Sequence, residues 1–438
     1  MRPDNAAFRA AKIFLLDTLS VGISGSAAPG AAAIRQVAQS WGDGEKTSIL
    51  GADFSLPKSS AAFVNAFQIH CQEFDCVHEQ AVVHAMSVTT AAMLSELNDE
   101  RISGEHFLRS LICGVDLACA MGVATTSGLR FFRPATAGAF GAVLAVSMMR
   151  NASSEQLLQA WGHVYSQIPG TMQSHVEGAI TLPMQVGYAA RAAINAVQFS
   201  ETSLSAPVNV FDGDFGYFNL IEDEWDEDYF AHKLGEKWLI TELSHKPFPT
   251  GRAAHAILAT LQELQQEHEF TLYDCDNITA YVPELIFRLV ARPISASMKV
   301  SYARLCLQYL VPNLLLDGAL TASSYRAERM TSEKNLSYGA RVNIEQNDNP
   351  DPNAMSPQRL VLELKDGRRF DERIPYTLGS PDRPLTREQY LHKFHRCCSE
   401  AQTEISMQQQ KSLLEMVENL EHEPDAARLL VLCQARSS

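Results

Sequence analysis

Basic residues are scarce in this sequence, and their scarcity limits the partners that we expect. Lys and Arg total 36 against 51 Asp and Glu, which gives the chain a formal net charge of -15. No run of basic residues interrupts this acidity, whereas nucleic acids and anionic membranes bind basic patches. We therefore expect neither nucleic acid nor membrane as a partner, although a few local cations can still bind a small anionic substrate.

A leader pattern and long apolar runs are also lacking. The first 30 residues contain no basic segment followed by a long apolar one, and apolar stretches elsewhere are interrupted by charges or amides before about 18 residues. The nine cysteines are an odd number without the spacing of a secreted disulfide framework. These absences predict a cytoplasmic protein with reduced thiols.

The chain does have the length and the apolar content for two cores, with 438 residues of which 46% are hydrophobic. Ala, Leu, Met and Val recur at helical spacing as far as about residue 199, whereas "NITAYVPELIF" and "QRLVLELKDGRRFDERIPY" alternate apolar with polar residues around a hairpin turn at Asp366 and Gly367. We predict a mainly α protein with a smaller α+β domain: a helical domain over 1–243, an α+β lid domain over 244–384, and a return to the helical domain over 385–438.

One short stretch, "FQIHCQEFDCVHEQAVVHAMS" over residues 67–87, concentrates titratable groups. Its Cys and His pairs are five, six and eight residues apart, which does not fit the usual spacings of zinc ligands, so we predict no metal site. A polar loop between helices and an acid/base site both remain open. The interleaved apolar residues, such as Phe74 and Val82, favour a loop held against a core, where pKa values are perturbed.

Two further segments carry cations. In "SHKPFPTGRAAHA" (244–256), Lys246, Arg252 and His255 flank a stiff Pro-x-Pro turn ahead of a helix, which suits a carboxylate ligand, although a solvated surface loop fits the same pattern. In "RFFRPATAGAFG" (130–141), Arg133 precedes a run of small residues. Arg133 either points to water from a packed helix or helps to clamp a di- or tricarboxylate.

Taken in order, these segments resemble the MmgE/PrpD family over nearly the whole chain. The opening "FLLDTLSVGISGS", the stretch around residues 59–87, the Gly-rich "TAGAFGAVLA", "SQIPGTMQSHVEGAIT", "HKPFPTGRAAHA", "ARLCLQYLVPNLLLDG" and the closing "LKDGRRF…LGSPDRPLTREQYLHKF" are each similar to a family segment. The resemblance implies a large helical domain with an α+β lid, a homodimer, and dehydratase, decarboxylase or epimerase chemistry on small carboxylic acids.

The resemblance also implies site residues, position by position. His84, Lys246 and Tyr309 match family catalytic positions, Glu73 and Asp75 fall on its acidic pair, and His78 is expected to support them. We expect Arg133, Gln185, Arg252 and His255 to bind substrate. Elsewhere the chain departs from the family, because Val77 stands in place of Thr, Leu182 in place of Lys, and Phe132 or Arg133 in place of His.

These departures leave the reaction open while the general chemistry stays the same. The first interpretation is a lyase without a cofactor, which removes water, or less expectedly carbon dioxide, from a small di- or tricarboxylic acid after abstraction of an α-proton. The second is an isomerase that epimerises a dicarboxylate such as an iminodisuccinate-like compound. The third is a family member without catalysis, which merely binds a ligand or partner.

Overall fold

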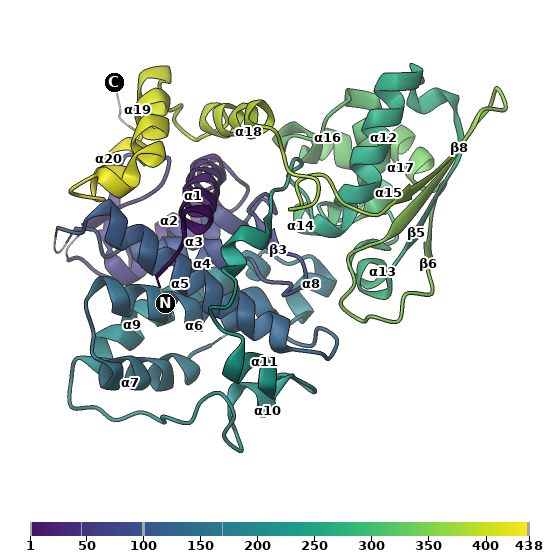
Figure 1. Ribbon diagram of the computed structural model, residues 1–438. Helices are drawn as coiled ribbons and strands as arrows, with labels where there is room; N and C mark the ends of the chain where they lie inside the picture. Colours follow the sequence, from purple (N-terminus) through teal and green to yellow (C-terminus); the bar gives the residue numbers. More distant parts are fainter. Residues whose placement is uncertain (1, 45, 99–100, 169, 436–438) are drawn as a thin grey trace.

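The computed structural model describes residues 2–44, 46–98, 101–168 and 170–435, which form a larger helical body and a smaller α+β part (Figure 1). The helices of the body are α1 (Asn5–Gly25), α2 (Ala31–Gln39), α3 (Lys58–His70), α4 (Ala85–Leu94), α5 (Gly104–Ala124), α6 (Arg133–Met149), α7 (Ser154–Tyr165), α8 (Gln173–Glu177), α9 (Thr181–Ser200), α10 (Tyr217–Ile221), α11 (Glu227–His232), α18 (Arg387–Ser399), α19 (Met407–Glu418) and α20 (Arg428–Cys433). The short strands β1 (Lys46–Ser48) and β2 (Ser55–Pro57) form an antiparallel pair at its edge. The predicted fold class, mainly α with a smaller α+β part, is confirmed.

The centre of the body is built from helices with small residues. Every residue of α4 is buried, as are nearly all of α3 and α6. Where α5 crosses α6, a Cβ atom on Gly114 would lie 2.5 Å from the carbonyl oxygen of Gly141, and a Cβ on Gly141 would lie 2.2 Å from that of Gly114. Side chains at these two positions would force the helices apart, so glycine permits the close crossing.

The chain forms two large apolar cores. One core draws its buried residues from 7–243 and again from 394–435, so the C-terminal helices pack with the N-terminal ones. Lys393 on α18 supports this return by an ion pair of 2.6 Å with Asp17 on α1. The second core runs from Phe248 to Ile374.

The α+β part contains a four-stranded sheet in the order β6-β5-β7-β8. Its elements are β5 (Cys275–Val282), β6 (Val342–Gln346), β7 (Gln358–Leu364) and β8 (Arg369–Ile374), with α12 (His255–His268), α13 (Glu284–Val290), α14 (Val300–Ala303), α15 (Leu307–Asp317), α16 (Ala327–Met330) and α17 (Glu333–Gly339). Strand β5 is parallel to β6 and antiparallel to β7, and β7 pairs with β8 through the predicted turn, where Gly367 has φ 91°. In Figure 1, α12 and α15 lie on one side of this sheet.

Helix α5 is long and apolar enough to cross a membrane by length and composition, which the interruptions in the sequence had not led us to expect. Of its most apolar window, 83% is buried inside the protein. It lies against α6, the N-terminal helix α1 and the 3₁₀ helix Leu239–Glu242. The apolar character of α5 is therefore used in the core of the body.

Two very short strands join the segments that carry most of the predicted site residues. Strand β3 (Val77–His78) pairs with β4 (Leu243–Ser244), which sets Val77 opposite Ser244 and His78 opposite Leu243. In Figure 1, β3 lies between the helical body and the α+β part. The stretch after α3 and the segment containing Lys246 therefore meet at the junction of the two cores.

Candidate active site

The segment between α3 and α4 forms one wall of the candidate site. Helix α3 ends at His70 and α4 begins directly after His84, so the two histidines lie at facing helix ends. Between them, Glu73 and Val82 both have φ 53°. A positive φ is unfavourable for a side chain with a Cβ, and most unfavourable for a β-branched one such as Val82, so the surrounding structure must hold this loop in place.

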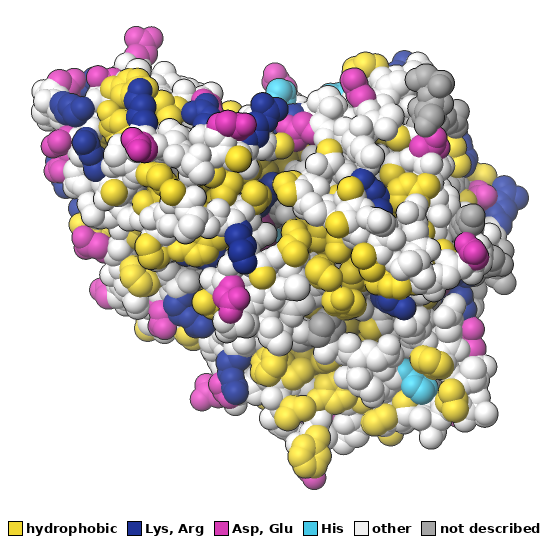
Figure 2. Space-filling model, turned by 180° about the vertical axis from the view of Figure 1, so that it is seen from behind, with side chains coloured by type: hydrophobic (Ala, Val, Ile, Leu, Met, Phe, Trp, Pro, Cys, Tyr) yellow, Lys and Arg dark blue, Asp and Glu magenta, His cyan; other side chains and the backbone are white. Residues whose placement is uncertain are grey.

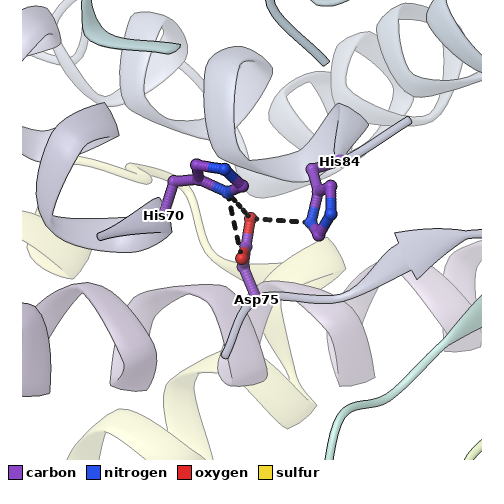
Figure 3. A group of neighbouring side chains, drawn as sticks. All are labelled: His70, Asp75 and His84. Carbon is purple, nitrogen blue, oxygen red and sulfur yellow. Dashed lines mark hydrogen bonds and ion pairs between the residues drawn. The ribbon is translucent and has the colours of Figure 1, made fainter. Parts of the chain in front are cut away.

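Asp75 is the centre of the site (Figure 3). Its carboxylate is fully buried and lies 2.9 Å from Nδ1 of His70 and 3.1 Å from Nδ1 of His84. The hydroxyl of Ser87 on α4 donates a third hydrogen bond to the same carboxylate oxygen, Oδ2. Because an ionised carboxylate only accepts, both histidines carry a proton on Nδ1, and their Nε2 atoms are left for other partners.

The two histidines differ in their surroundings. Their rings lie edge to face with centroids 4.8 Å apart. Within the described residues, Nε2 of His70 has no hydrogen bond, but it lies 3.6 Å from Oε1 of Glu73. Both rings line the same cavity, so two imidazoles that share one carboxylate are presented to whatever the cavity binds.

The charges around the histidines separate their pKa values. Burial opposes the charged form of His70, but Asp75 and Glu73 outweigh it and raise the pKa of His70. Burial lowers the pKa of His84, and Lys246 adds to this effect against the attraction of Asp75. Burial would raise the pKa of Asp75, yet the two histidines hold it well below its usual value. Near neutral pH Asp75 is therefore ionised and His84 is neutral, whereas His70 stays protonated to a higher pH than an ordinary histidine.

Lys246 and Glu73 form a buried ion pair beside this cluster. Nζ of Lys246 lies 3.1 Å from both the carbonyl oxygen and Oε2 of Glu73, and the lysine side chain is fully buried. The positive φ of Glu73 allows its carbonyl and its carboxylate to reach the same ammonium group. Burial would raise the pKa of Glu73, but Lys246 and His70 lower it to about 2.

Arg252 and Glu79 form a second ion pair at the junction. Nε and Nη2 of Arg252 lie 2.9 and 2.7 Å from Oε1 of Glu79, which also accepts from Ser244 at 2.7 Å. The guanidinium further donates to backbone carbonyls, including that of His245 at 3.0 Å. Arg252 reaches the cavity wall with its charge already compensated, so it fixes the segment that carries Lys246.

A small cavity of about 70 Å³ lies between these groups. Both cores contribute to its wall. Its lining residues are His70, Glu73, Val77, Glu79, Val82, His84, Leu129, Phe132, Pro134, Met172, His175, Gly251, Arg252, Ala253, Leu289, Leu305 and Met355. Most of this wall is apolar, so the titratable groups act in surroundings that strengthen electrostatic interactions.

Several residues predicted for the site do not lie in the cavity wall. Arg133 is fully buried and bound to Glu222, with Nε 3.1 Å from Oε1, so its charge is not free for a substrate. His78 faces Glu242, with Nε2 3.4 Å from Oε2. Gln185 spans the backbone of Thr171, accepting from its N–H at 2.6 Å and donating to its carbonyl at 3.1 Å.

Tyr309 and His255 belong to the second core. The hydroxyl of Tyr309 donates to the carbonyl of Ser324, and burial raises the pKa of this phenol. His255 is fully buried with Nε2 3.1 Å from the carbonyl oxygen of Thr250, and burial holds its pKa well below the usual value. These two residues, like Arg133, His78 and Gln185, make structural contacts outside the cavity wall, and their roles at the site stay predictions.

Two histidines of the cavity wall were missing from the predicted set. His70 lies in the stretch that the sequence singled out, but its role becomes visible only through its contact with Asp75. His175 comes from α8, far along the chain, in a segment that the sequence had marked for resemblance and not for chemistry. The density of titratable residues signalled the first, whereas no local pattern signalled the second.

His70, Asp75 and His84 also meet the distance requirement for a metal site, since one ligand atom from each lies within 4.8 Å of the others. Their arrangement is fully accounted for by hydrogen bonds, because both Nδ1 atoms and Ser87 already point at one carboxylate. A metal ion bound there would replace these hydrogen bonds and require both imidazoles to lose the Nδ1 proton. The observed donor arrangement fits an acid/base cluster better than a metal centre.

A cavity at the junction of a helical body and an α+β part, with a buried carboxylate and two histidines, defines a candidate enzyme for small molecules. Family models identify the family of the chain. The MmgE/PrpD N-terminal domain matches residues 2–229 and the MmgE/PrpD C-terminal domain matches residues 248–422. The chain belongs to the MmgE/PrpD family, as the order of its motifs had indicated.

Curated relatives extend over almost the whole chain at low identity. The chain is 25% identical to the cis-aconitate decarboxylase of Homo sapiens, over 97% of this chain and 90% of the relative. It is 24% identical to that of Mus musculus, over 96% and 88%, and 21% identical to one from Aspergillus terreus, over 98% and 92%. The similarity therefore includes both cores and all segments that meet at the cavity.

We predict that Asp75→Asn lowers the pKa of His70, because the substitution removes the neighbouring negative charge that keeps this imidazole protonated. NMR titration of the protein with ¹³C-labelled histidine measures it, with a His70→Gln variant to assign the resonance. A pKa of His70 that stays unchanged in Asp75→Asn would contradict the arrangement. His232 serves as an internal control, because its side chain and that of its partner Asp228 are both exposed.

Proposed function

We propose that this protein is a lyase that removes carbon dioxide or water from a small tricarboxylic acid. The observation that carries the proposal is the pair of histidines bridged by Asp75 at the wall of the cavity, one favouring and one disfavouring its charged form. Such a pair supplies a base and an acid at the same pH. Reactions at a carbon next to a carboxylate need a proton removed or delivered and negative charge stabilised.

The residues have separate roles in this proposal. His84 takes a proton through Nε2, because its neutral form is favoured and its Nδ1 is held by Asp75. His70, richer in protons, stabilises negative charge or returns a proton. Asp75 fixes both rings, and Lys246 with Glu73 controls the electric field beside them. Among the predicted catalytic residues, His84, Asp75, Glu73 and Lys246 are therefore kept in the proposal.

The relatives described above favour decarboxylation over dehydration, since each is named a cis-aconitate decarboxylase. The cavity wall of this chain has apolar Val77 and Phe132, with the ring of Phe132 centred 5.7 Å from that of His70. Apolar surroundings weaken the solvation of a carboxylate, and loss of carbon dioxide is promoted where a carboxylate is poorly solvated. We therefore place decarboxylation ahead of dehydration.

An epimerase is the second candidate, and the paired histidines favour it as well. Epimerisation removes a proton from one face of a carbon and returns one to the other, so it needs two acid/base groups and no leaving group. We propose that either reaction proceeds without a cofactor, because the hydrogen bonds to Asp75 leave the histidines as proton carriers. A ligand-binding protein without turnover is the remaining alternative.

We predict that His84→Ala and Lys246→Ala each reduce turnover at least about a hundredfold, from loss of the base and of the charge beside it. The assay incubates the protein with cis-aconitate, citrate and related acids in deuterated water and follows the products by NMR. A lyase gives a new alkene or carbon dioxide, and an epimerase gives deuterium at an α-carbon without either.

His232→Ala is the matched control, because this histidine is exposed on α11, and its activity should stay at the wild-type level. Near wild-type turnover in folded His84→Ala would contradict its role as base. A wild-type protein that neither exchanges nor converts any of the acids would favour the third alternative. Dialysis against EDTA should leave the activity unchanged.

The pH dependence of turnover is expected to be bell-shaped. His84 must be neutral to accept a proton, and its lowered pKa places the acid limb below pH 6.5. His70 must keep its second proton, and its raised pKa places the alkaline limb above pH 6.5. Because the rings share Asp75 and lie near Glu73 and Lys246, the two limbs report the cluster as a unit.

Measurement of kcat/KM against pH checks this prediction, with His70→Gln as the diagnostic variant. In a folded His70→Gln protein with residual turnover, the alkaline limb should disappear while the acid limb remains. A profile that stays bell-shaped in this variant would contradict the assignment of the alkaline limb to His70.

We also propose that the protein is a cytoplasmic homodimer. The nine cysteines are free, which suits a reducing compartment. Several large apolar side chains are exposed near the end of α9 and in the loop that follows: Phe199, Leu204, Val208 and Phe215. Figure 2 shows hydrophobic side chains gathered over the lower part of the molecule as seen from behind. Such patches commonly mark interfaces.

Sedimentation velocity tests the assembly. We expect twice the chain mass of 48.3 kDa for the wild type, and a shift towards the chain mass for the double variant Leu204→Glu and Val208→Glu, because the charges would be buried at the interface. The control is a double substitution at two other exposed hydrophobic positions, Tyr376→Glu and Met407→Glu. A monomeric wild type would contradict the proposal.

A further inference from the structure

Arg292 is a buried cation without a carboxylate partner. It follows α13 in the α+β part and is 7% exposed. Within the described residues, no carboxylate lies at ion-pair distance from it, whereas buried Arg133 is bound to Glu222 and Arg252 to Glu79. Burying an uncompensated charge is unfavourable, so a second charge is expected to meet it.

The contacts of Arg292 leave one nitrogen of its guanidinium without a hydrogen bond. Nε donates to the carbonyl of Leu289 at 3.0 Å, and Nη2 donates to the carbonyl of His175 at 2.8 Å. The guanidinium also lies over the ring of Tyr302, 5.0 Å from its centroid. In the described part of the chain, the buried Nη1 has no hydrogen-bond partner. All these contacts are with neutral groups, so no carboxylate of the described chain pairs with the positive charge.

His175 links Arg292 to the cavity. Arg292 lies behind the cavity wall, but His175 and Leu289, the two residues that it binds, line the cavity. Nη2 of Arg292 lies closer to Nδ1 of His175, at 2.8 Å, than to Nε2, at 3.2 Å. Burial, with Arg292 beside it, lowers the pKa of His175 to about 3, so the ring is neutral. A neutral ring that accepts on Nδ1 carries its proton on Nε2, which makes Nε2 a donor.

Two other cations, Lys246 beside the cavity and Arg252 in its wall, are already paired with carboxylates. Lys246 is bound by Glu73, and Arg252 is bound by Glu79 with further bonds to carbonyl groups. The link of Arg292 to the cavity is its contact with the wall residues His175 and Leu289. Arg304, which is 2% exposed, also has no carboxylate of the described chain at ion-pair distance, but it donates to the carbonyls of Gln72 and Pro249. Arg292 is likewise unpaired, but it differs because it contacts a wall residue, His175.

We propose that Arg292 and His175 form the carboxylate-recognition pair of this cavity. Nη1 of Arg292 binds one carboxylate of the substrate, and Nε2–H of His175 donates to the same group. The inference rests on the proposed function, since it gives the tricarboxylate substrate its anchor. The anchored carboxylate lies on the side of the cavity formed by α8 and the segment after α13, and the carbon that reacts lies on the side of His70 and His84.

The pair also accounts for one departure of this chain from its family. Leu182 stands where the resemblance places a lysine, and it is packed in the core of the helical body. The positive charge missing at that position is supplied in this chain by a residue of the α+β part. The substrate would then be held between the two cores, with its anchor on one and the acid/base cluster on the other.

Binding of propane-1,2,3-tricarboxylate, a saturated probe with three carboxylates, tests the pair by isothermal titration calorimetry. Arg292→Gln should weaken binding about tenfold to a hundredfold, as expected for loss of a charge-assisted hydrogen bond. Arg292→Lys should recover part of the affinity because it restores the charge. His175→Gln should weaken binding less than Arg292→Gln. Glutarate lacks the middle carboxylate and should bind the wild type more weakly than propane-1,2,3-tricarboxylate. If the middle carboxylate is the one that Arg292 binds, the two probes should bind Arg292→Gln with similar affinity.

Arg341→Gln is the matched control, since it removes one positive charge from an exposed position of the same part of the chain, where the guanidinium contacts the ring of Tyr338. Its affinity should equal that of the wild type. Circular dichroism and melting temperature establish that each variant is folded. If Arg292→Gln does not fold, Arg292→Lys and His175→Gln decide the question.

The proposal is overturned if folded Arg292→Gln binds the probe with wild-type affinity, or if folded Arg292→Lys and folded His175→Gln both do. A wild type that binds neither probe also overturns it. The proposed function fails separately. If the wild type binds the probe through Arg292 but converts no acid, the carboxylate-recognition pair stands and the lyase proposal fails. If the wild type turns over and the KM is unchanged in Arg292→Gln, the lyase proposal stands and the recognition pair fails.

Discussion

The ionised carboxylate of Asp75, buried between two imidazoles and a hydroxyl, is the interaction on which the site depends. A buried charge is unfavourable unless several donors meet it, and here His70, His84 and Ser87 supply them from the end of α3 and the beginning of α4. Because both histidines use Nδ1 for this purpose, both Nε2 atoms are directed elsewhere. One carboxylate therefore fixes the distance between two helix ends, the tautomers of two rings and the separation of their pKa values.

The fold supplies this interaction with its surroundings. Small residues bring α5 and α6 close together, and α4 is buried along its whole length, so the helix that carries Ser87 is held rigidly. The loop between the histidines includes two residues with positive φ, Glu73 and Val82, and this strain must be offset by the pairing of β3 with β4 and by the ion pairs of Lys246 and Arg252. The parts of the chain that make the site are thus the parts that connect the two cores.

Much of the architecture could be predicted from the sequence, because helical periodicity and the Asp366–Gly367 turn are local signals. The segments of the site could also be found, since titratable residues are dense around Asp75 and the motifs follow the order of the family. Partners could not be predicted. Arg133 was expected to bind substrate, yet Glu222, 89 positions further along the chain, takes its charge. His175 and Arg292 belong to different cores, and their contact follows from the packing of the two parts alone.

The pairing of β3 with β4 has a consequence for how a molecule enters the cavity. It ties the segment of His78 to that of Leu243 by backbone hydrogen bonds, so the wall bearing Glu73 moves together with the segment bearing Lys246. Parting these two segments would break the strand pair and the buried ion pair at once. The remaining wall, where Met172, Leu289 and Met355 present apolar side chains, is held by neither this strand pair nor this ion pair. We therefore expect the substrate to enter on the side of the cavity where neither this strand pair nor this ion pair holds the wall.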